Sequence, residues 1–273
     1  MSIEGLRGFN HLHSIDIMSR HNRKPGWIRD KHDHRDLKFG AVIKLSTDPL
    51  PESIDNRNLA PPVFDQGHLG SCTAHGTLAA FRMTLKQENK PDFEASRLAH
   101  YALSRQMEGM LDQDSGAEIR DAVKVLSENG TILESEWPYD VSRFRELPGS
   151  TLLTEALQHK CLVYESVPLN KEAFKRAIVE NGSVIIGITL YESFMSYEVE
   201  RTGIVPTPNT AIEEIDGGHC MLAVGYTNHE TAIVRNSWGT SWGQSGYCEI
   251  PLSYLLNPEL AGDYWTLRDI DAV

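Results

Sequence analysis

A glycine-rich loop that leads into an amphipathic helix holds the first candidate for chemistry. The loop runs from Gln66 to Ser71, and Cys72 follows at the predicted start of the helix. Unpaired N–H groups and the positive end of the helix dipole favour a thiolate there, so we expect the pKa of Cys72 to lie below the free value of about 8.5. The other three cysteines lie in hydrophobic runs and are expected to be buried, unreactive thiols: Cys161, Cys220 and Cys248.

A nucleophilic thiolate needs a base to take its proton and a group to orient that base. His219 follows Asp216-Gly217-Gly218, whose glycines allow a close approach of the backbone, and it begins a predicted strand. Asn236 opens the sequence Asn-Ser-Trp-Gly, and a neutral amide can accept a hydrogen bond from an imidazole nitrogen. His75, one turn beyond Cys72, is a rival base, although we expect it to pack beneath the site.

The elements that must position these residues differ between the two halves of the chain. Apolar residues repeat at helical spacing at Leu78, Phe81 and Leu85 and from Ile119 to Leu126, which predicts helices in the first half. One further helix, ended by Asn181-Gly182, precedes four predicted strands: 183–190, 220–226, 231–236 and 246–250. A helical half followed by a strand half indicates an α+β chain of two lobes, with a cleft where they meet.

Composition and charge exclude several other classes of protein. The 273 residues carry 26 basic and 38 acidic side chains, a net charge of −12, which argues against a nucleic-acid platform. The longest apolar run, Val184 to Leu190, is far shorter than the span of about 20 residues that a membrane helix needs. No secretory signal peptide is visible, so we expect a cytoplasmic location by default, or export by a route without such a signal.

No metal or cofactor is expected. His32-Asp33-His34 has residue types that bind metals but lacks two further spaced ligands. The four cysteines lie too far apart for a zinc cluster, so free thiols are expected. His68, in the loop before Cys72, is expected to be an exposed loop residue.

The first 49 residues, here called the arm, differ from residues 50–273, the body. The arm carries 9 basic and 6 acidic residues, a charge of +3, whereas the body carries 17 and 32, a charge of −15. The arm also holds five of the eleven histidines and lacks a sustained helical or alternating period. Two interpretations are open: a disordered basic tail, or an extended segment that lies across the acidic body and inhibits it from within the cleft.

Four stretches of the chain resemble the papain-like cysteine peptidases. The family pattern Q-G-x-C-G-S-C-W is present as Q-G-H-L-G-S-C-T at 66–73, and the family's His-containing strand matches G-H-C-M-L-A-V-G-Y at 218–226. The pattern N-S-W-G-x-x-W-G-x-x-G-Y is complete at 236–247, and P-E-S-I-D-N-R at 51–57 is similar to the mature start. His219 lies 147 residues and Asn236 164 residues after Cys72, compared with about 130–150 for this family.

The resemblance covers about residues 50–250 and implies a two-lobed papain-like fold that hydrolyses peptide bonds without a cofactor. It implies that Cys72 is the nucleophile, His219 the general base and then acid, and Asn236 the group that orients the imidazole. Gln66 would donate a hydrogen bond to the oxyanion. Trp238, with Trp242 beside it, would screen the His–Asn bond from water.

Substrate-binding residues are also implied by the resemblance. Ser115 and Gly116 stand where the family has glycines whose backbone pairs with the substrate. Gly218, Cys220 and the run from Val184 to Ile188 are implied to line the neighbouring pocket. The substrate is then a peptide or protein, and the chain is expected to act as a monomer without nucleic acid or membrane.

Departures from the family pattern concern the surroundings of the triad. Leu69 replaces a cysteine that forms a disulfide in many members, and Thr73 and Asn56 each replace a usual tryptophan. The arm is too short for a long helical pro-region. Through Gly26-Trp27-Ile28 it resembles instead the N-terminal stretch of bacterial members such as xylellain.

The sequence thus predicts an autoinhibited endopeptidase. The arm (1–49) is a pro-like segment, and the catalytic domain (50–273) consists of a mainly helical lobe (50–160) and a mainly β lobe (161–273). Two other functions stay open: acyl transfer by the same triad, and peptide binding without catalysis.

Overall fold

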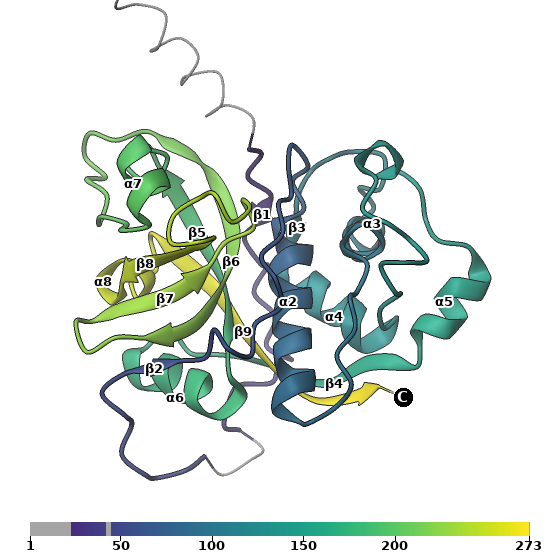
Figure 1. Ribbon diagram of the computed structural model, residues 1–273, viewed down its shortest axis with the longest axis horizontal. Helices are drawn as coiled ribbons and strands as arrows, with labels where there is room; N and C mark the ends of the chain where they lie inside the picture. Colours follow the sequence, from purple (N-terminus) through teal and green to yellow (C-terminus); the bar gives the residue numbers. More distant parts are fainter. Residues whose placement is uncertain (1–22, 42–44, 273) are drawn as a thin grey trace, which may run out of the picture.

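Two lobes flank a long central helix in the computed structural model, which describes residues 23–41 and 45–272 (Figure 1). The helices of these residues are α2 (Cys72–Gln87), α3 (Arg97–Met107), α4 (Ile119–Glu128), the 3₁₀ turn η1 (Val141–Arg143), α5 (Ser150–Ala156), α6 (Lys171–Asn181), α7 (Tyr197–Thr202) and α8 (Leu252–Leu255). The strands are β1 (Trp27–Ile28), β2 (Ile54–Asp55), β3 (Ala117–Glu118), β4 (His159–Ser166), β5 (Val184–Tyr191), β6 (Ile215–Tyr226), β7 (Thr231–Arg235), β8 (Tyr247–Pro251) and β9 (Ala261–Ala272). The two-lobed α+β fold is as predicted.

Helix α2 is buried on nearly all sides because both lobes pack against it. The predicted face of Leu78, Phe81 and Leu85 is buried, and so are Ala80 and Met83 on other faces. The helix contacts α3 and α4 on one side and β6 and β9 on the other. Its first residue therefore lies at the boundary between the lobes.

An antiparallel sheet forms the other lobe. Its strand order is β4-β9-β5-β6-β7-β8, and β2 pairs with the far end of β6. Strands β5 to β8 lie where the sequence predicted strands, although β6 begins five residues earlier, at Ile215. Residues 219–226 of β6 are all buried, because α2 covers one face of the sheet and a second apolar cluster covers the other.

Strands β4 and β9 are absent from the prediction. Charged and polar residues interrupt both runs, as in Thr266, Arg268 and Asp269 of β9, so neither has the continuous apolar pattern of a buried strand. The two strands nevertheless pair with each other in antiparallel orientation, with His159 opposite Ala272 and Ser166 opposite Trp265. Tertiary pairing thus decides the structure of these segments.

The first described stretch of the arm, from residue 23 to β1, runs between the two lobes (Figure 1). Trp27 and Ile28 form β1, which pairs in parallel with β3 of the helical lobe, and Lys38 bridges to Ser166 at the end of β4. His11, His13 and His21 lie outside the described residues. Within the described chain, no helix is long and apolar enough to span a membrane, and no group of three or more His, Cys, Asp or Glu could hold a metal ion.

Candidate active site

The start of α2 and the middle of β6 bring Cys72 and His219 together. Cys72 is fully buried, and its sulfur accepts a hydrogen bond from the backbone N–H of Cys220 at 3.4 Å. His219, the preceding residue on β6, is also fully buried. The predicted nucleophile and the strand segment that carries the predicted base therefore lie side by side at the boundary of the lobes.

The imidazole of His219 is held by Asn236 and by a tryptophan. Its Nε2 lies 2.8 Å from Asn236 Oδ1, which also accepts the backbone N–H of Ser237 at 2.8 Å. Because that second donor identifies Oδ1 as the amide oxygen, Nε2 must carry the proton, and Nδ1 is the basic nitrogen. Nδ1 has no hydrogen-bond partner among the described residues. Trp238 stacks on the ring at 4.8 Å between centroids, and Trp242 packs edge-on against Trp238.

Gln66 lies on the loop just before α2 with its amide fixed at both ends. Its Oε1 accepts a hydrogen bond from Ser237 Oγ at 2.6 Å, which leaves Nε2 as the donor. Nε2 donates to the backbone oxygens of Leu69 at 2.9 Å and Lys24 at 3.1 Å. A carbonyl oxygen of the arm thus accepts the amide N–H that the resemblance assigns to an oxyanion.

The arm reaches the nucleophile through its backbone. The Gly26 carbonyl accepts the Ala117 N–H at 2.8 Å, and an added Cβ at Gly116 would lie 2.2 Å from that carbonyl oxygen. On the β lobe, a Cβ at Gly218 would lie 2.4 Å from the carbonyl oxygen of Trp27. The predicted substrate-binding glycines, Gly116 and Gly218, are therefore the places where the arm's backbone fits closely.

Burial sets the charge state of the Cys–His pair. Burial raises the pKa of Cys72 to about 11, although N–H groups of Cys220 and Gly26 offset part of that effect. Burial also lowers the pKa of His219 to about 4, against the hydrogen bond to Asn236, and Arg23 of the arm lowers it further. The prediction of a lowered pKa for Cys72 is wrong for this state, because desolvation outweighs the helix dipole.

Ion pairs join the arm to acidic residues of the body. Lys24 Nζ lies 2.7 Å from Asp114, Lys31 lies 3.3 Å from Glu118, and Arg23 lies 3.5 Å from Glu200. A reverse pair joins Arg120 of α4 to Asp36 of the arm at 2.6 Å. These pairs are distributed along both lobes, so the arm is anchored on each side of the cleft.

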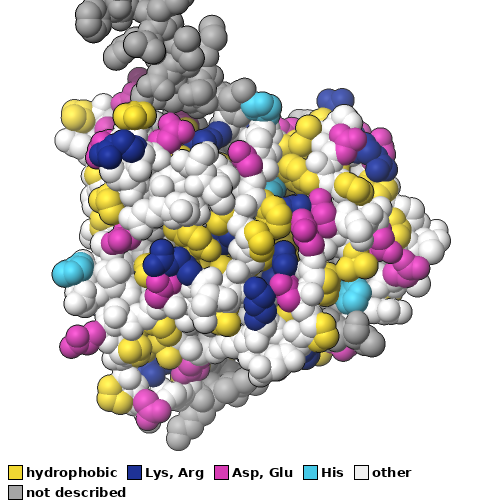
Figure 2. Space-filling view, in the orientation of Figure 1, with side chains coloured by type: hydrophobic (Ala, Val, Ile, Leu, Met, Phe, Trp, Pro, Cys, Tyr) yellow, Lys and Arg dark blue, Asp and Glu magenta, His cyan; other side chains and the backbone are white. Residues whose placement is uncertain are grey.

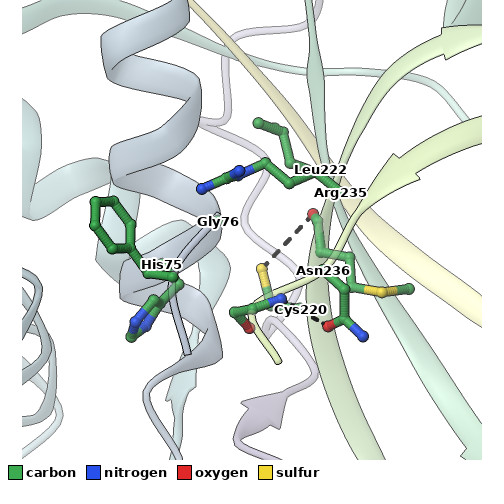
Figure 3. Close-up of a pocket in the computed structure, with 9 residues that line it drawn as sticks. His75, Gly76, Cys220, Leu222, Arg235 and Asn236 are labelled. Atoms are coloured by element: carbon green, nitrogen blue, oxygen red, sulfur yellow. Dashed lines mark hydrogen bonds between the residues drawn. The ribbon is translucent and has the colours of Figure 1, made fainter. Parts of the chain in front are cut away.

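Several other predicted residues lie around the site rather than in it. His75 is buried beneath it, where its Nδ1 lies 3.0 Å from the Ser71 carbonyl oxygen and its ring meets Tyr139 edge-on. Figure 3 shows the small space lined by His75 and Cys220, into which Arg235 extends from the end of β7. His68 is exposed, and Ser115 Oγ donates to the carbonyl of Gly116. All four cysteines are free and buried.

Two acidic residues that sequence reasoning did not single out support the site. Asp114 Oδ1 accepts hydrogen bonds from Gly70 N–H and the Tyr101 hydroxyl, which ties the loop before Cys72 to α3. Asp263 on β9 contacts the arm, through the N–H groups of Trp27 and Asp30. No motif surrounds Asp263, and the resemblance at Ser115 and Gly116 gives Asp114 no role, so only the folded arrangement identifies the two acidic residues.

Comparisons with known proteins agree with this geometry. Residues 50–254 match the papain family of cysteine proteases. An uncharacterized peptidase C1-like protein of Acanthamoeba polyphaga mimivirus is 36% identical over 91% of this chain and 88% of its own length. Cysteine proteinase 3 of Entamoeba histolytica is 29% identical over 75% of this chain, which spans 64% of that relative. The crystal structure of xylellain, a cysteine protease from Xylella fastidiosa, superposes with a TM-score of 0.81 at 31% identity, covering 92% of this chain and 98% of that one.

Proposed function

The chain belongs to the papain family of cysteine proteases, and we propose that it is an endopeptidase with a Cys72–His219–Asn236 triad and an oxyanion hole that includes Gln66. The observation that carries this proposal is the hydrogen bonding of His219. Asn236 accepts a hydrogen bond from His219 Nε2, which leaves Nδ1 as the basic nitrogen. His219 directly precedes Cys220, whose backbone N–H donates to the Cys72 sulfur. This arrangement suits proton transfer from the thiol.

The reaction follows from these positions once a substrate replaces the arm. Cys72 gives its proton to His219 Nδ1, and the thiolate attacks the carbonyl carbon of the scissile bond. The Gln66 side-chain amide and the Cys72 backbone N–H stabilise the negative oxygen, and His219 then protonates the leaving amine. In the second half, His219 takes a proton from water, whose oxygen attacks the thioester carbon and releases the acid.

The test of this function separates hydrolysis from its two alternatives. The full-length chain carrying Trp27→Ala, so that the arm does not mask its activity, is incubated at pH 7.5 with a fluorogenic peptide, with and without an added amine. Its activity is then titrated with iodoacetamide. We expect a free carboxylic acid as the product and complete loss of activity at one alkylation per chain, mapped by mass spectrometry to Cys72. A peptide joined to the added amine would identify an acyl transferase. Peptide binding without any product would identify a non-catalytic relative.

We also propose that the arm (1–49) is an autoinhibitory segment of the catalytic domain (50–273), whose lobes are residues 50–160 and 161–273. The Lys24 carbonyl beside Gln66, together with the Gly26 and Trp27 backbone against Gly116 and Gly218, supports this proposal. A neutral thiol beside a neutral imidazole, the state that burial favours here, is a poor nucleophile. Lysine, arginine and acidic side chains are interspersed on the face in Figure 2. The arm itself is held by discrete pairs, such as Lys24 with Asp114 and Lys31 with Glu118.

Arm docking is expected to weaken as the pH rises from about 4 to about 7. Asp30 of the arm faces Asp263 of the body, and burial with that neighbouring charge raises the pKa of Asp30 to about 7, despite donors from Arg120 and Trp265. A free aspartate has a pKa of about 3.9. In this window the docked arm holds a proton that the released arm gives up, so rising pH favours release, by about tenfold or more in the docking equilibrium.

Hydrogen exchange measures this pH dependence. The Ala117 N–H, which donates to Gly26, reports docking after correction for the intrinsic exchange rate at each pH. Asp30→Asn should keep the arm docked at pH 8 and flatten the dependence. Asp33→Asn is the matched control, since the partner of Asp33 is Arg35 within the arm itself. A wild-type dependence in the Asp30→Asn variant would contradict this assignment.

A further inference from the structure

The indole of Trp27 lies in a flat slot between two strands of the β lobe. A Cβ at Gly187 of β5 would lie 2.2 Å from the Trp27 ring, and one at Gly218 of β6 would lie 3.0 Å from it. Both strands therefore need glycine for the ring to enter. Ile185 and Cys220 belong to the same apolar cluster as Trp27, which is only 8% exposed. The slot is built to hold a planar side chain.

Asp263 places a carboxylate at this slot. Its Oδ2 accepts hydrogen bonds from Trp27 Nε1 at 3.1 Å and from the Asp30 N–H at 2.7 Å. Asp263 lies at an irregularity of β9, where the pairing with β5 passes from Ile185–Trp265 to Gly187–Gly262. Its φ is +55°, a conformation that costs a residue other than glycine about 1 kcal/mol or more. A bulge of this kind re-aims a side chain, here toward the slot.

The arm satisfies this carboxylate, and release of the arm leaves it without those partners. Within the described residues, both hydrogen bonds that Asp263 accepts come from the arm, and so does the nearby positive charge of Arg29. Arg120 of the body is the other cation that acts on Asp263, and in the docked state its guanidinium is bonded to Asp36 of the arm. Asp36 leaves with the arm, so Arg120 is the cation that a substrate side chain must compete with at Asp263. An uncompensated, partly buried carboxylate is costly, so the emptied slot favours a cationic donor.

We propose that this slot receives a substrate side chain and that Asp263 makes it select arginine there. The proposal rests on the proposed function, because a substrate must enter where the arm now lies. A guanidinium is planar like the indole it would replace, and it presents N–H donors along its edge. Two such donors match a carboxylate in a bidentate pair, which a leucine or other apolar side chain cannot form.

The test compares arginine with citrulline, which has the same shape but no charge. The Trp27→Ala variant of the full-length chain empties the slot, and fluorogenic peptides carry arginine, citrulline or leucine at the first, second or third residue before the scissile bond. At one position we expect kcat/KM for arginine to exceed that for citrulline by about 10- to 100-fold. Adding Asp263→Asn should bring this ratio to within about threefold of one. Asparagine suits this site because it tolerates a positive φ.

A control variant and a measurement that needs no turnover distinguish failure of the slot proposal from failure of the proposed function. Asp216→Asn, an exposed acid on β6, should leave the arginine-to-citrulline ratio unchanged. An arginine preference that survives Asp263→Asn would overturn the proposal. So would an arginine-to-citrulline ratio near one when Asp263 is intact, which would mean that Arg120 neutralises Asp263. If no peptide is cleaved, the proposed function fails, and the slot is tested through the arm itself. Trp27→Arg should then protect the Ala117 N–H from exchange better than Trp27→Leu, and Asp263→Asn should abolish that advantage; equal protection would overturn it.

Discussion

Replacing Cys72 with alanine is expected to lower kcat for peptide hydrolysis by about 10⁵- to 10⁶-fold, the loss seen when a triad nucleophile is removed. The sulfur is the atom that must bond to the substrate carbon, and it lies next to the segment of β6 that carries His219, since it accepts the N–H of Cys220. The measurement uses the full-length chain with Trp27→Ala, so that the arm does not mask the difference. Binding of a peptide should persist in the Cys72→Ala variant, because the glycine backbone at Gly116 and Gly218 is unchanged.

Cys248→Ala provides a matched control for this experiment. Cys248 is also fully buried, lies on β8, and belongs to the apolar cluster of the β lobe. Its loss should reduce stability through a small cavity and leave kcat within about threefold. An equal loss of activity in both variants would mean that packing, not nucleophilic chemistry, is affected, and the assignment of Cys72 would be wrong.

The sequence could point to residues that stand within a short, recognisable motif. Cys72 follows a glycine-punctuated loop, His219 follows two glycines, and Asn236 begins a compact aromatic motif. Each motif also determines its own element, the start of α2, the middle of β6 and the turn after β7. These elements meet at the boundary of the lobes, where Asn236 bonds His219 and the Cys72 sulfur accepts the N–H of Cys220.

What sequence could not predict depends on contacts between distant segments. The direction of the Cys72 pKa shift is the clearest case, because the helix start favours a thiolate while burial beneath the arm, more than 40 residues away in the chain, reverses it. Asp263 is a second case. Its role depends on an irregularity in β9, a strand whose mixed polar sequence did not predict a strand at all. Both effects arise only once the chain has folded.

The Trp27→Ala variant is expected to increase the rate of Cys72 alkylation at pH 5.5 by about 10²- to 10³-fold. The indole fills the slot between Gly187 and Gly218, and loss of a buried tryptophan side chain costs about 3–5 kcal/mol. If alkylation requires release of the arm, the loss of docking free energy raises the fraction of molecules in which Cys72 is accessible by the corresponding factor. The low pH makes the measurement selective, since an ordinary thiol is almost fully protonated there.

Ile28→Ala separates this effect from a general weakening of the arm. Ile28 is the next residue of β1, and its side chain is 38% exposed, on the opposite side of the strand from Trp27. Ile28→Ala shortens another apolar side chain of the same strand but leaves the slot filled by Trp27, so the alkylation rate should rise by less than about threefold. A comparable rise in both variants would mean that β1 pairing as a whole, rather than the indole, holds the arm. No rise in either would mean that the arm does not limit access to Cys72, and the autoinhibitory role would have to be abandoned.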